Sequence, residues 1–460
     1  SVGLSGGVVS FISPALGSGN FAVAQKYLMH FMVLYVFVAL LVPLCTLTWM
    51  DQLCVLLGAP KGTQMHQFAS QYGYIIFSLG TVVYFVNYGF GNILRALSRS
   101  IFNSVKQVVS SLLQLLFVYL FYTFVVARGH VQMYTNAISP VLASFVTSVA
   151  VILLFCPFKK FLRTFKLKFS LRGLRPFDWK ALLEICYYSI PDWLTQFQIP
   201  LTVMTGNAIF AALAQSNSQN NWNITVLGIT YKMSPLVMIS NQAFSYAFGP
   251  SFGYALGAKD WKRAREAMRI CFFWMSGIAL LFFVVMNVSV EAFSISLMQG
   301  YQPMSDDVTL GFRCYQAWLP LLPCFLMMND INQMEQKPLK AFLVQGARLV
   351  AVIAFECIIA YGTKSYKGVY YGYIAGDFVA CVVGIACFIE RYVTYGKLER
   401  GEITTIQAKI GEVTGDIIRP WRQNKRAPKQ TVEAVKMKES TLDAATVIKN
   451  DFLDDAPING

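Results

Sequence analysis

The residues best suited to chemistry in this sequence are a few charged side chains that interrupt long apolar stretches. They are Asp192, Lys232, Glu356 and Asp377. A charge at the centre of an apolar, membrane-spanning helix costs about 2.5 to 3.5 kcal/mol on insertion scales, so such residues are the first functional candidates. A carboxyl group in that setting can take up and release a proton or bind a small cation. This pattern favours ion coupling.

The aspartates each allow a functional and a structural interpretation. Asp192 follows Pro191 near the expected start of its helix, where it either faces a central cleft as a proton or cation site or is solvated. Asp377 lies in the last apolar stretch and either titrates or makes a structural hydrogen bond. Asp330 stands near a helix end, and there we expect it to be solvated.

The basic residues inside apolar stretches favour structural pairing. Lys232 either extends its ammonium group toward water or pairs with a buried carboxylate, for which Glu356 is the candidate partner. Arg348 is expected to be structural. These two are the only basic residues that we place clearly inside the spans.

Neutral polar residues recur at helical spacing beside these charges. They are Gln196, Gln198, Asn207, Asn241 and Gln242. Such a stripe either lines a water-filled cavity or makes helix-to-helix hydrogen bonds worth about 0.6 kcal/mol each. Gln198, Asn207 and Gln242 are therefore candidate contacts for a substrate or ion.

Several kinds of reactive site are missing from the sequence. Its ten cysteines form no CxxC pair and its three histidines are not paired, so neither a zinc site nor a disulfide framework is indicated. Cys45 and Cys54 flank one loop and are expected to be free thiols, and His30 has no obvious partner. No GxxxxGK(S/T) motif for nucleotide phosphates occurs. We expect no enzyme activity, no metal, and no cofactor beyond a coupling ion, H⁺ or Na⁺.

The elements that position these residues are membrane-spanning helices. Hydrophobic residues make up 55% of the chain and charged residues only 13%, whereas a soluble domain has about 25% charged residues. Apolar stretches of about 20 residues can cross roughly 30 Å of hydrocarbon, and a helix satisfies its backbone polar groups there. We predict an all-α, multi-pass membrane protein. A partial helix occupies 1–14, and the spans are 27–48, 72–94, 101–125, 137–156, 190–213, 226–252, 268–290, 311–328, 339–361 and 369–392.

Charge distribution predicts the orientation of the helices. The chain has a net charge of +14, and its basic residues lie between the apolar stretches and in the C-terminal part. This distribution is typical of the positive-inside rule and not of nucleic-acid binding. Segment 157–180 holds eight Lys or Arg and one Asp, and we expect a cytoplasmic linker between bundles at 1–156 and 181–393. Segment 394–460 is expected to be a largely disordered cytoplasmic tail. The uncharged loop on the opposite face contains the sequon Asn223-Ile224-Thr225, which would be usable there.

An internal repeat links the two halves. Ala15-Leu16-Gly17-Ser18 matches Ala255-Leu256-Gly257-Ala258 at an offset of 240 positions, and at that offset Ala24 matches Ala264. A repeat within so hydrophobic a chain predicts a transporter made of two related helical bundles.

These motifs resemble those of multidrug and toxic compound extrusion (MATE) transporters. Three segments are similar to that family in order and spacing. SFISPALGSGNFAVAQ resembles the end of its second helix, NILRALSRSIFNSVKQVVSSLLQLLF its fourth loop and fifth helix, and FGPSFGYALGAKDWKRAREAM the end of its eighth helix. The resemblance covers roughly 1–397 and implies two six-helix bundles related by a pseudo-twofold axis along the membrane normal. Eleven helices would be present, with the first truncated and the family's helix one missing.

Departures from the family pattern favour its DinF-like branch. Ile199 stands where sodium-coupled and animal members carry Glu, Asn207 matches the Asn of that branch, and Ala255 replaces the usual Asn. The resemblance implies antiport of H⁺ or Na⁺ against amphipathic or cationic organic compounds. The alternative is a lipid-linked oligosaccharide flippase of the same superfamily, which would show more basic residues within the spans. We expect a monomer in the lipid bilayer of the plasma membrane or an organelle, with a small organic substrate as its partner.

Overall fold

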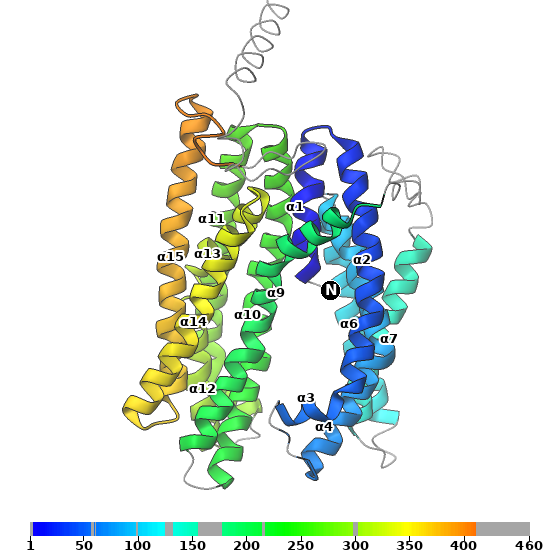
Figure 1. The fold of residues 1–460 in the computed structure, drawn as a ribbon. Helices are drawn as coiled ribbons and strands as arrows, with labels where there is room; N and C mark the ends of the chain where they lie inside the picture. Colours follow the sequence, from blue (N-terminus) through cyan, green and yellow to red (C-terminus); the bar gives the residue numbers. More distant parts are fainter. Residues whose placement is uncertain are drawn as a thin grey trace, which may run out of the picture.

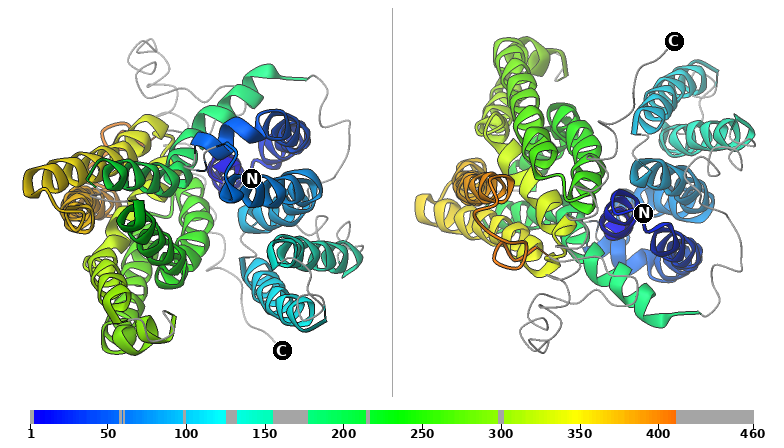
Figure 2. Two further views of the ribbon diagram at one scale, coloured as in Figure 1. Left: turned by 90° about the horizontal axis from the view of Figure 1, so that it is seen from below. Right: turned by 90° about the horizontal axis from the view of Figure 1, so that it is seen from above.

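Two bundles of helices lie side by side in the computed structural model (Figure 1; Figure 2). The structure describes residues 3–56, 59, 61–97, 100–124, 132–154, 177–213, 217–297 and 302–410, and these ranges contain helices and turns but no strand. The first bundle consists of α1 (Gly3–Gly17), α2 (Phe21–Thr48), α3 (Met50–Leu56), α4 (Gln64–Ile75), the π-helix η1 (Ile76–Gly80), α5 (Thr81–Ala96), α6 (Ser100–Phe124) and α7 (Gln132–Leu154). The second consists of α9 (Trp179–Leu213), α10 (Asn217–Gly257), α11 (Trp261–Leu297), α12 (Gln302–Gln316), α13 (Leu322–Met334), α14 (Pro338–Thr363) and α15 (Gly368–Glu399). The expected all-α fold is confirmed.

Five of the described helices are long and apolar enough to cross a membrane by themselves. These are α2, α6, α11, α14 and α15, and the pair α4–α5, bent by 48° around η1, makes a sixth. The predicted spans 190–213 and 226–252 belong to α9 and α10, which extend well beyond them at their N-terminal ends. Gln, Asn and Ser residues are frequent in α10 and lower its hydropathy, whereas in α9 the apolar stretch is interrupted by Asp192, Gln196, Gln198 and Asn207.

The predicted span 311–328 is broken in the structure. Helix α12 ends at Gln316 and α13 begins at Leu322. Pro320 lies in the intervening turn and Pro323 occupies the first turn of α13. Proline lacks a backbone N–H and clashes with the preceding turn, so a continuous helix is not available here. Two short helices replace the single span.

The sequence predicts an exposed loop around the sequon at Asn223, and this prediction is wrong. Asn223 lies within α10, which already begins at Asn217, and its side chain is only 2% exposed. A buried asparagine inside a helix is not accessible for glycan attachment. The prediction failed because a run of uncharged polar residues can continue a helix when tertiary contacts cover it.

The two copies of the internal repeat form the same turn. In the first copy, the backbone N–H of Ser18 donates to Pro14 O at 2.9 Å; in the second, Ala258 N–H donates to Tyr254 O at 3.0 Å. The caps also correspond, because Asn20 Oδ1 accepts from Val23 N–H and Asp260 Oδ1 accepts from Arg263 N–H. The left-handed position is held by Gly19 (φ 75°) and Lys259 (φ 56°). The repeat is therefore present in the structure as well as in the sequence.

The two repeat turns also pack against each other reciprocally. A Cβ atom at Gly17 would collide with the carbonyl oxygen of Tyr254, and a Cβ at Gly257 would collide with that of Pro14. Tyr254 occupies the same repeat position as Pro14. Such an exchange of equivalent contacts is what a twofold relation between two halves produces. We call the end of the molecule that holds Gly17 and Gly257 the contact end.

The bundles share one apolar core near the contact end. It includes Phe11 of α1, Leu94 of α5, Phe252 of α10 and Met327 of α13, all close to fully buried. Toward the other end, which holds α3, α4 and α12, the ribbons of the two bundles diverge (Figure 1). We call this the far end. Contact at one end and divergence at the other is the arrangement expected of one state in alternating access.

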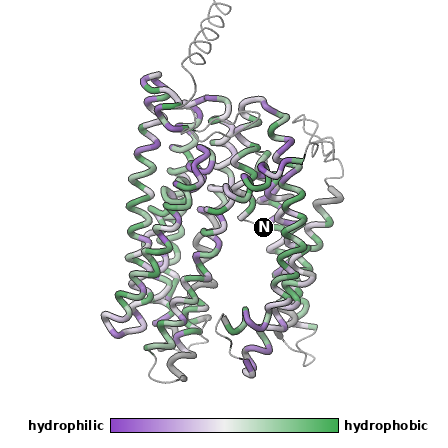
Figure 3. Tube along the Cα trace, in the orientation of Figure 1, coloured by the Kyte–Doolittle hydropathy of each residue, from purple (hydrophilic) through white to green (hydrophobic). Residues whose placement is uncertain are grey.

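The outer faces of the helices suit a lipid environment. On α6, large apolar side chains are exposed at helical spacing: Val105, Val108, Leu112, Leu115 and Tyr119. Hydrophobic residues are frequent along the long helices (Figure 3). Exposed apolar surface on this scale is not tolerated in water, so these faces indicate contact with hydrocarbon.

The start of the second bundle is fastened to α2 of the first. Lys26 Nζ and Asp178 Oδ2 are 2.7 Å apart, and the Lys26 ammonium holds the pKa of Asp178 below its usual range. His30 Nε2 accepts from Asp178 N–H at 3.1 Å, while its Nδ1 faces Lys26 O at 2.8 Å. Tyr27 donates its hydroxyl hydrogen to Glu184. His30, which has no obvious partner in the sequence, thus has two: Lys26 O one helical turn away and Asp178 N–H 148 positions along the chain.

The ordered chain continues past the bundle boundary expected at residue 393. Helix α15 runs to Glu399, and residues 400–410 turn back so that Ala408 and Ile410 are buried. Arg391 Nη1 donates to Ala408 O at 3.1 Å, which holds this segment on α15. The remainder of the predicted tail lies outside the described residues.

Candidate functional site

A cluster of charged and polar side chains bridges the two bundles near the contact end. Arg95, at the end of α5, is 5% exposed. Its Nη2 atom lies 3.8 Å from Asp330 Oδ1 of α13, and its Nε donates to Tyr246 O of α10 at 3.2 Å. The guanidinium also stands over the Tyr246 ring, 4.3 Å from the centroid. Ser245 donates to Asp330 Oδ2 at 2.5 Å. One residue of the first bundle is thus held by two helices of the second.

Asp330 is not solvated, contrary to the expectation from its place near a helix end. Its side chain is about one-twentieth exposed and is enclosed by Ser245 and Arg95. The end of α13 turns directly into α14, so the last turn is covered by neighbouring helices. The position of a residue relative to the end of its helix does not reveal whether neighbouring helices cover it.

Asp192 belongs to the same cluster. It lies well inside α9, which begins at Trp179, so the solvated helix start that we considered is excluded. Its Oδ1 accepts hydrogen bonds from Asn329 Nδ2 at 3.0 Å and from Gln333 Nε2 at 2.6 Å. A Cβ at Gly6 would meet its Oδ2, so α1 of the first bundle closes over the carboxylate. Asp192 therefore faces the bundle interface.

This interface cluster contains more acidic than basic side chains. Asp192 and Asp330 line one small cavity of about 70 Å³ together with Arg95. Gln196 and Gln345 add amide groups to its wall. Two carboxylates opposite one guanidinium leave one negative charge to be compensated, and an uncompensated charge at low dielectric is costly. The cavity is polar and large enough for a water molecule or a small cation.

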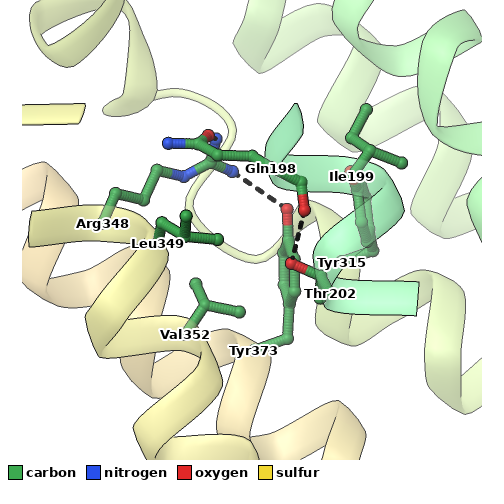
Figure 4. A pocket seen from close by; sticks show the side chains of 8 residues that line it. All are labelled: Gln198, Ile199, Thr202, Tyr315, Arg348, Leu349, Val352 and Tyr373. Atoms are coloured by element: carbon green, nitrogen blue, oxygen red, sulfur yellow. Dashed lines mark hydrogen bonds between the residues drawn. The ribbon is translucent and has the colours of Figure 1, made fainter. Parts of the chain in front are cut away.

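A second polar network lies within the second bundle (Figure 4). Arg348 of α14 donates from Nε to Asp377 Oδ1 of α15 at 2.8 Å, from Nη1 to Gln198 Oε1 of α9 at 2.9 Å, and from Nη2 to the Tyr373 hydroxyl at 2.9 Å. Gln198 Nε2 in turn donates to Gln345 O at 2.9 Å. The Arg348 guanidinium therefore ties three helices together, which agrees with the structural role expected of it.

Two further candidates have buried side-chain oxygen atoms without hydrogen-bond partners among the described residues. Glu356 of α14 has no exposed surface, and neither of its carboxyl oxygens meets a hydrogen-bond partner within the described residues. Asn207 Oδ1 of α9 is buried and lacks a partner in the same sense. The side chains of Lys232 and Gln242 lie outside the described part of the chain, so the predicted pairing of Lys232 with Glu356 stays a prediction. Asn241 is fully buried.

Sequence reasoning missed two buried basic residues. Arg95 lies one residue beyond the predicted span 72–94, and Lys106 lies inside the span 101–125. Both are less than 8% exposed in the structure. The statement that Lys232 and Arg348 are the only basic residues inside the spans is therefore wrong. Arg95 stands between Leu94 and Ala96, and Lys106 falls inside a predicted span, so each carried a signal in the sequence.

The cysteines are consistent with the expectation of free thiols. Cys45 on α2 and Cys54 on α3 are both unpaired. Within the ranges that the structure covers, no group of three or more His, Cys, Asp or Glu side chains is arranged to hold a metal ion.

Comparison with known proteins assigns the fold to a family of transporters. A family model described as MatE matches residues 1–120 and 201–358. No curated protein sequence matches the chain.

Three solved structures illustrate the likeness. The first, "Crystal structure of MATE in complex with MaL6", is 19% identical, with 86% of this chain and 85% of that chain covered and a TM-score of 0.73. The second, "Outward-facing conformation of a multidrug resistance MATE family transporter of the MOP superfamily", is 19% identical over 86% and 84% of the two chains, with a TM-score of 0.70. The third is a MOP superfamily transporter from Pyrococcus furiosus whose title reads "Reverse polarity of binding pocket suggests different function". It is 20% identical over 86% and 85%, with a TM-score of 0.71.

At these identities the solved structures establish the fold, and the family model establishes the membership. The repeat turns, the apolar outer faces and the polar interface between two bundles are all features that this fold explains. Because the family model matches more than half of the residues and several helices are long and apolar enough to span a bilayer, this chain belongs to the MatE family and is a multi-pass membrane transporter.

Proposed function

We propose that this transporter is a cation-coupled antiporter of the DinF-like branch, in which entry of H⁺ or Na⁺ drives export of amphipathic or cationic organic compounds by alternating access. The observation that supports it is the interface cluster of Arg95, Asp192 and Asp330. A coupling ion must act on a group whose surroundings differ between the two transport states. In this structure Arg95 pairs with Asp330, and lines the same cavity as Asp192, only because the bundles touch at the contact end.

The charge arrangement suggests how an ion would bias the transition. While the bundles touch, the positive charge of Arg95 offsets one of the two carboxylates. When they separate, both carboxylates lose that partner and attract a cation more strongly. By linkage, cation binding then favours separation at the contact end. The positive-inside rule places the contact end in the cytoplasm, so an ion arriving from outside would promote opening to the inside.

The available energy is sufficient for export. One elementary charge that moves across 100 mV releases about 2.3 kcal/mol. At about 1.4 kcal/mol for each tenfold ratio, this sustains roughly a fiftyfold gradient of a neutral substrate. One ion per cycle therefore meets the need, and no nucleotide hydrolysis is required.

The flippase of the same superfamily remains the second candidate. It would hold a pyrophosphate with basic residues inside the spans, and the structure adds Arg95 and Lys106 to Arg348 in that category. However, Arg95 and Arg348 both face carboxylates, so their charge is already offset. Lys106 is the one observation that favours a phosphorylated or otherwise anionic substrate.

The decisive experiment is efflux of a fluorescent organic cation from proteoliposomes under an imposed pH or sodium gradient, using the full-length protein. Asp330→Asn and Asp192→Asn should each reduce gradient-driven efflux by about tenfold or more, because each removes a group that the ion would neutralise. Asp178→Asn is the matched control, since that aspartate is partly exposed and distant from the cluster. Intact coupling in both interface variants would refute the site, and a wild-type protein that moved no organic cation under either gradient would refute the antiport.

A further inference from the structure

The first bundle contains a polar cavity that is separate from the interface cluster. Its volume is about 530 Å³, and it lies between α4, α5, α6 and α7. Polar groups dominate its lining, including Lys106, Asn87, Tyr84, Tyr88 and Ser110. Cavities of about 300 to 1,000 Å³ accommodate drug-sized molecules.

Lys106 is the charged group of this cavity. Its side chain is 7% exposed, and its ammonium donates one hydrogen bond to the backbone oxygen of Asn87. An ammonium has three donors, and contacts among the described residues account for one of them, which leaves two for a ligand. The Tyr88 ring centroid lies 6.0 Å from Nζ, at the limit of a cation–π contact.

No carboxylate balances this ammonium among the described residues. Residues 1–156 contain a single acidic side chain, Asp51. It lies on α3, is half exposed and faces His66 at 4.0 Å. A buried, unbalanced ammonium at membrane depth is costly, and an anionic ligand would offset that cost.

The remaining lining complements an organic anion rather than a simple ion. Tyr84 and Tyr88 have ring centroids 6.3 Å apart and form an aromatic wall. Ser110, Ser111 and Gln114 supply further hydrogen-bond donors from successive turns of α6. A ring-bearing molecule can contact the aromatic wall while its acidic group reaches the lysine. A chloride or phosphate ion alone would leave most of the volume without contacts.

We propose that this cavity is a binding site for amphipathic, ring-bearing organic anions, with the acidic group of the ligand on the Lys106 ammonium. The site would make such anions a substrate class of the transporter, and to that extent the inference rests on the function proposed above. Binding itself does not depend on ion coupling. The two ideas can therefore be tested apart.

The test is equilibrium binding of radiolabelled p-aminohippurate, an aromatic carboxylate, to the full-length protein in nanodiscs without any gradient. Lys106→Met should weaken binding by about 10- to 100-fold, as expected for loss of a charge-assisted hydrogen bond. Lys106→Arg should keep most of the affinity because it retains the cation. Lys61→Ala is the matched control, because Lys61 is an exposed lysine of the same bundle.

The outcomes separate the alternatives. Displacement by excess salicylate but not by equal concentrations of chloride or phosphate supports an organic-anion site, whereas equal displacement by the inorganic ions would overturn it. The proposal would also be overturned if the Lys106→Met protein had the melting temperature of wild type and bound p-aminohippurate with unchanged affinity. If Lys106→Met fails to fold, the same comparison is made with Ser111→Ala and Tyr84→Leu, and unchanged affinity in both refutes the site. If wild type binds p-aminohippurate as described but shows no gradient-driven efflux of the organic cation, the antiport fails while the site stands.

Discussion

Corresponding helices of the two bundles carry buried cationic side chains that differ in whether a carboxylate lies beside them. Counted from the repeat turns, α6 of the first bundle corresponds to α14 of the second, and α7 corresponds to α15. Lys106 on α6 has no carboxylate partner among the described residues, whereas Arg348 on α14 is ion-paired with Asp377 on α15. At the offset of 240 positions Asp377 corresponds to Ala137 of α7, and α7 contains no acidic residue.

The difference shows that duplication preserved the backbone frame while the charges diverged. The repeat turns keep the same hydrogen bonds and the same caps in both halves. The paired cation of the second bundle is satisfied internally and stabilises it. The cation of the first bundle is available to a ligand. We therefore assign structural support to the Arg348 network and recognition to the Lys106 cavity.

Removal of Arg348 should have the largest effect of the changes considered. Arg348→Ala leaves Asp377 buried without its partner, which should lower the free energy of unfolding by about 3–5 kcal/mol. Lys106→Met, by contrast, should leave stability unchanged or raise it, because it removes an unbalanced charge. Thermal unfolding of both variants in the same detergent tests this. Equal destabilisation by the two variants would break the comparison.

The repeat glycines should respond equally if the halves are related by a twofold axis. Gly17→Ala and Gly257→Ala each drive a methyl group into a backbone carbonyl of the other turn, and overpacking of this kind costs about 1–3 kcal/mol. Both should loosen the contact end and raise the labelling rate of a cysteine introduced there. Gly277→Ala on α11 is the control, because its Cβ would meet no atom within 4 Å. A large effect of one glycine variant and none of the other would contradict the reciprocal contact.

The smallest effect is expected at the Lys26–Asp178 ion pair, where the start of the second bundle meets the first. Lys26 lowers the pKa of Asp178 in the folded protein. The stabilisation is therefore fully present above the unfolded carboxyl pKa of about 3.9 and is lost as the pH falls through the lower folded value. Between pH 5 and pH 3 the melting temperature of wild type should fall further than that of Lys26→Met. Because both side chains are about one-third exposed, the difference should be small. Parallel pH curves for the two proteins would show that the pair contributes nothing.

Much of the site could be anticipated, but its assembly could not. Asp192, Gln198, Glu356 and Asp377 stood out because polar groups are expensive in apolar helices. What periodicity does not reveal is the partner. Asp192 contacts α13, more than one hundred positions away, and Arg95 contacts α10 at a similar separation. The order of helices around a bundle decides such contacts.

The sequence by itself determined the helical class, the two-bundle division, the repeat turns and the candidate acids. Each of these follows from local hydrophobicity, glycine conformation or the cost of charge in hydrocarbon, all of which depend on neighbours along the chain. Only the tertiary structure decided that α9 and α10 begin earlier, that Asn223 is buried, that Asp330 is enclosed, and which cation has a carboxylate beside it. Those outcomes depend on which helices lie together, because burial and charge balance are set by neighbours in space.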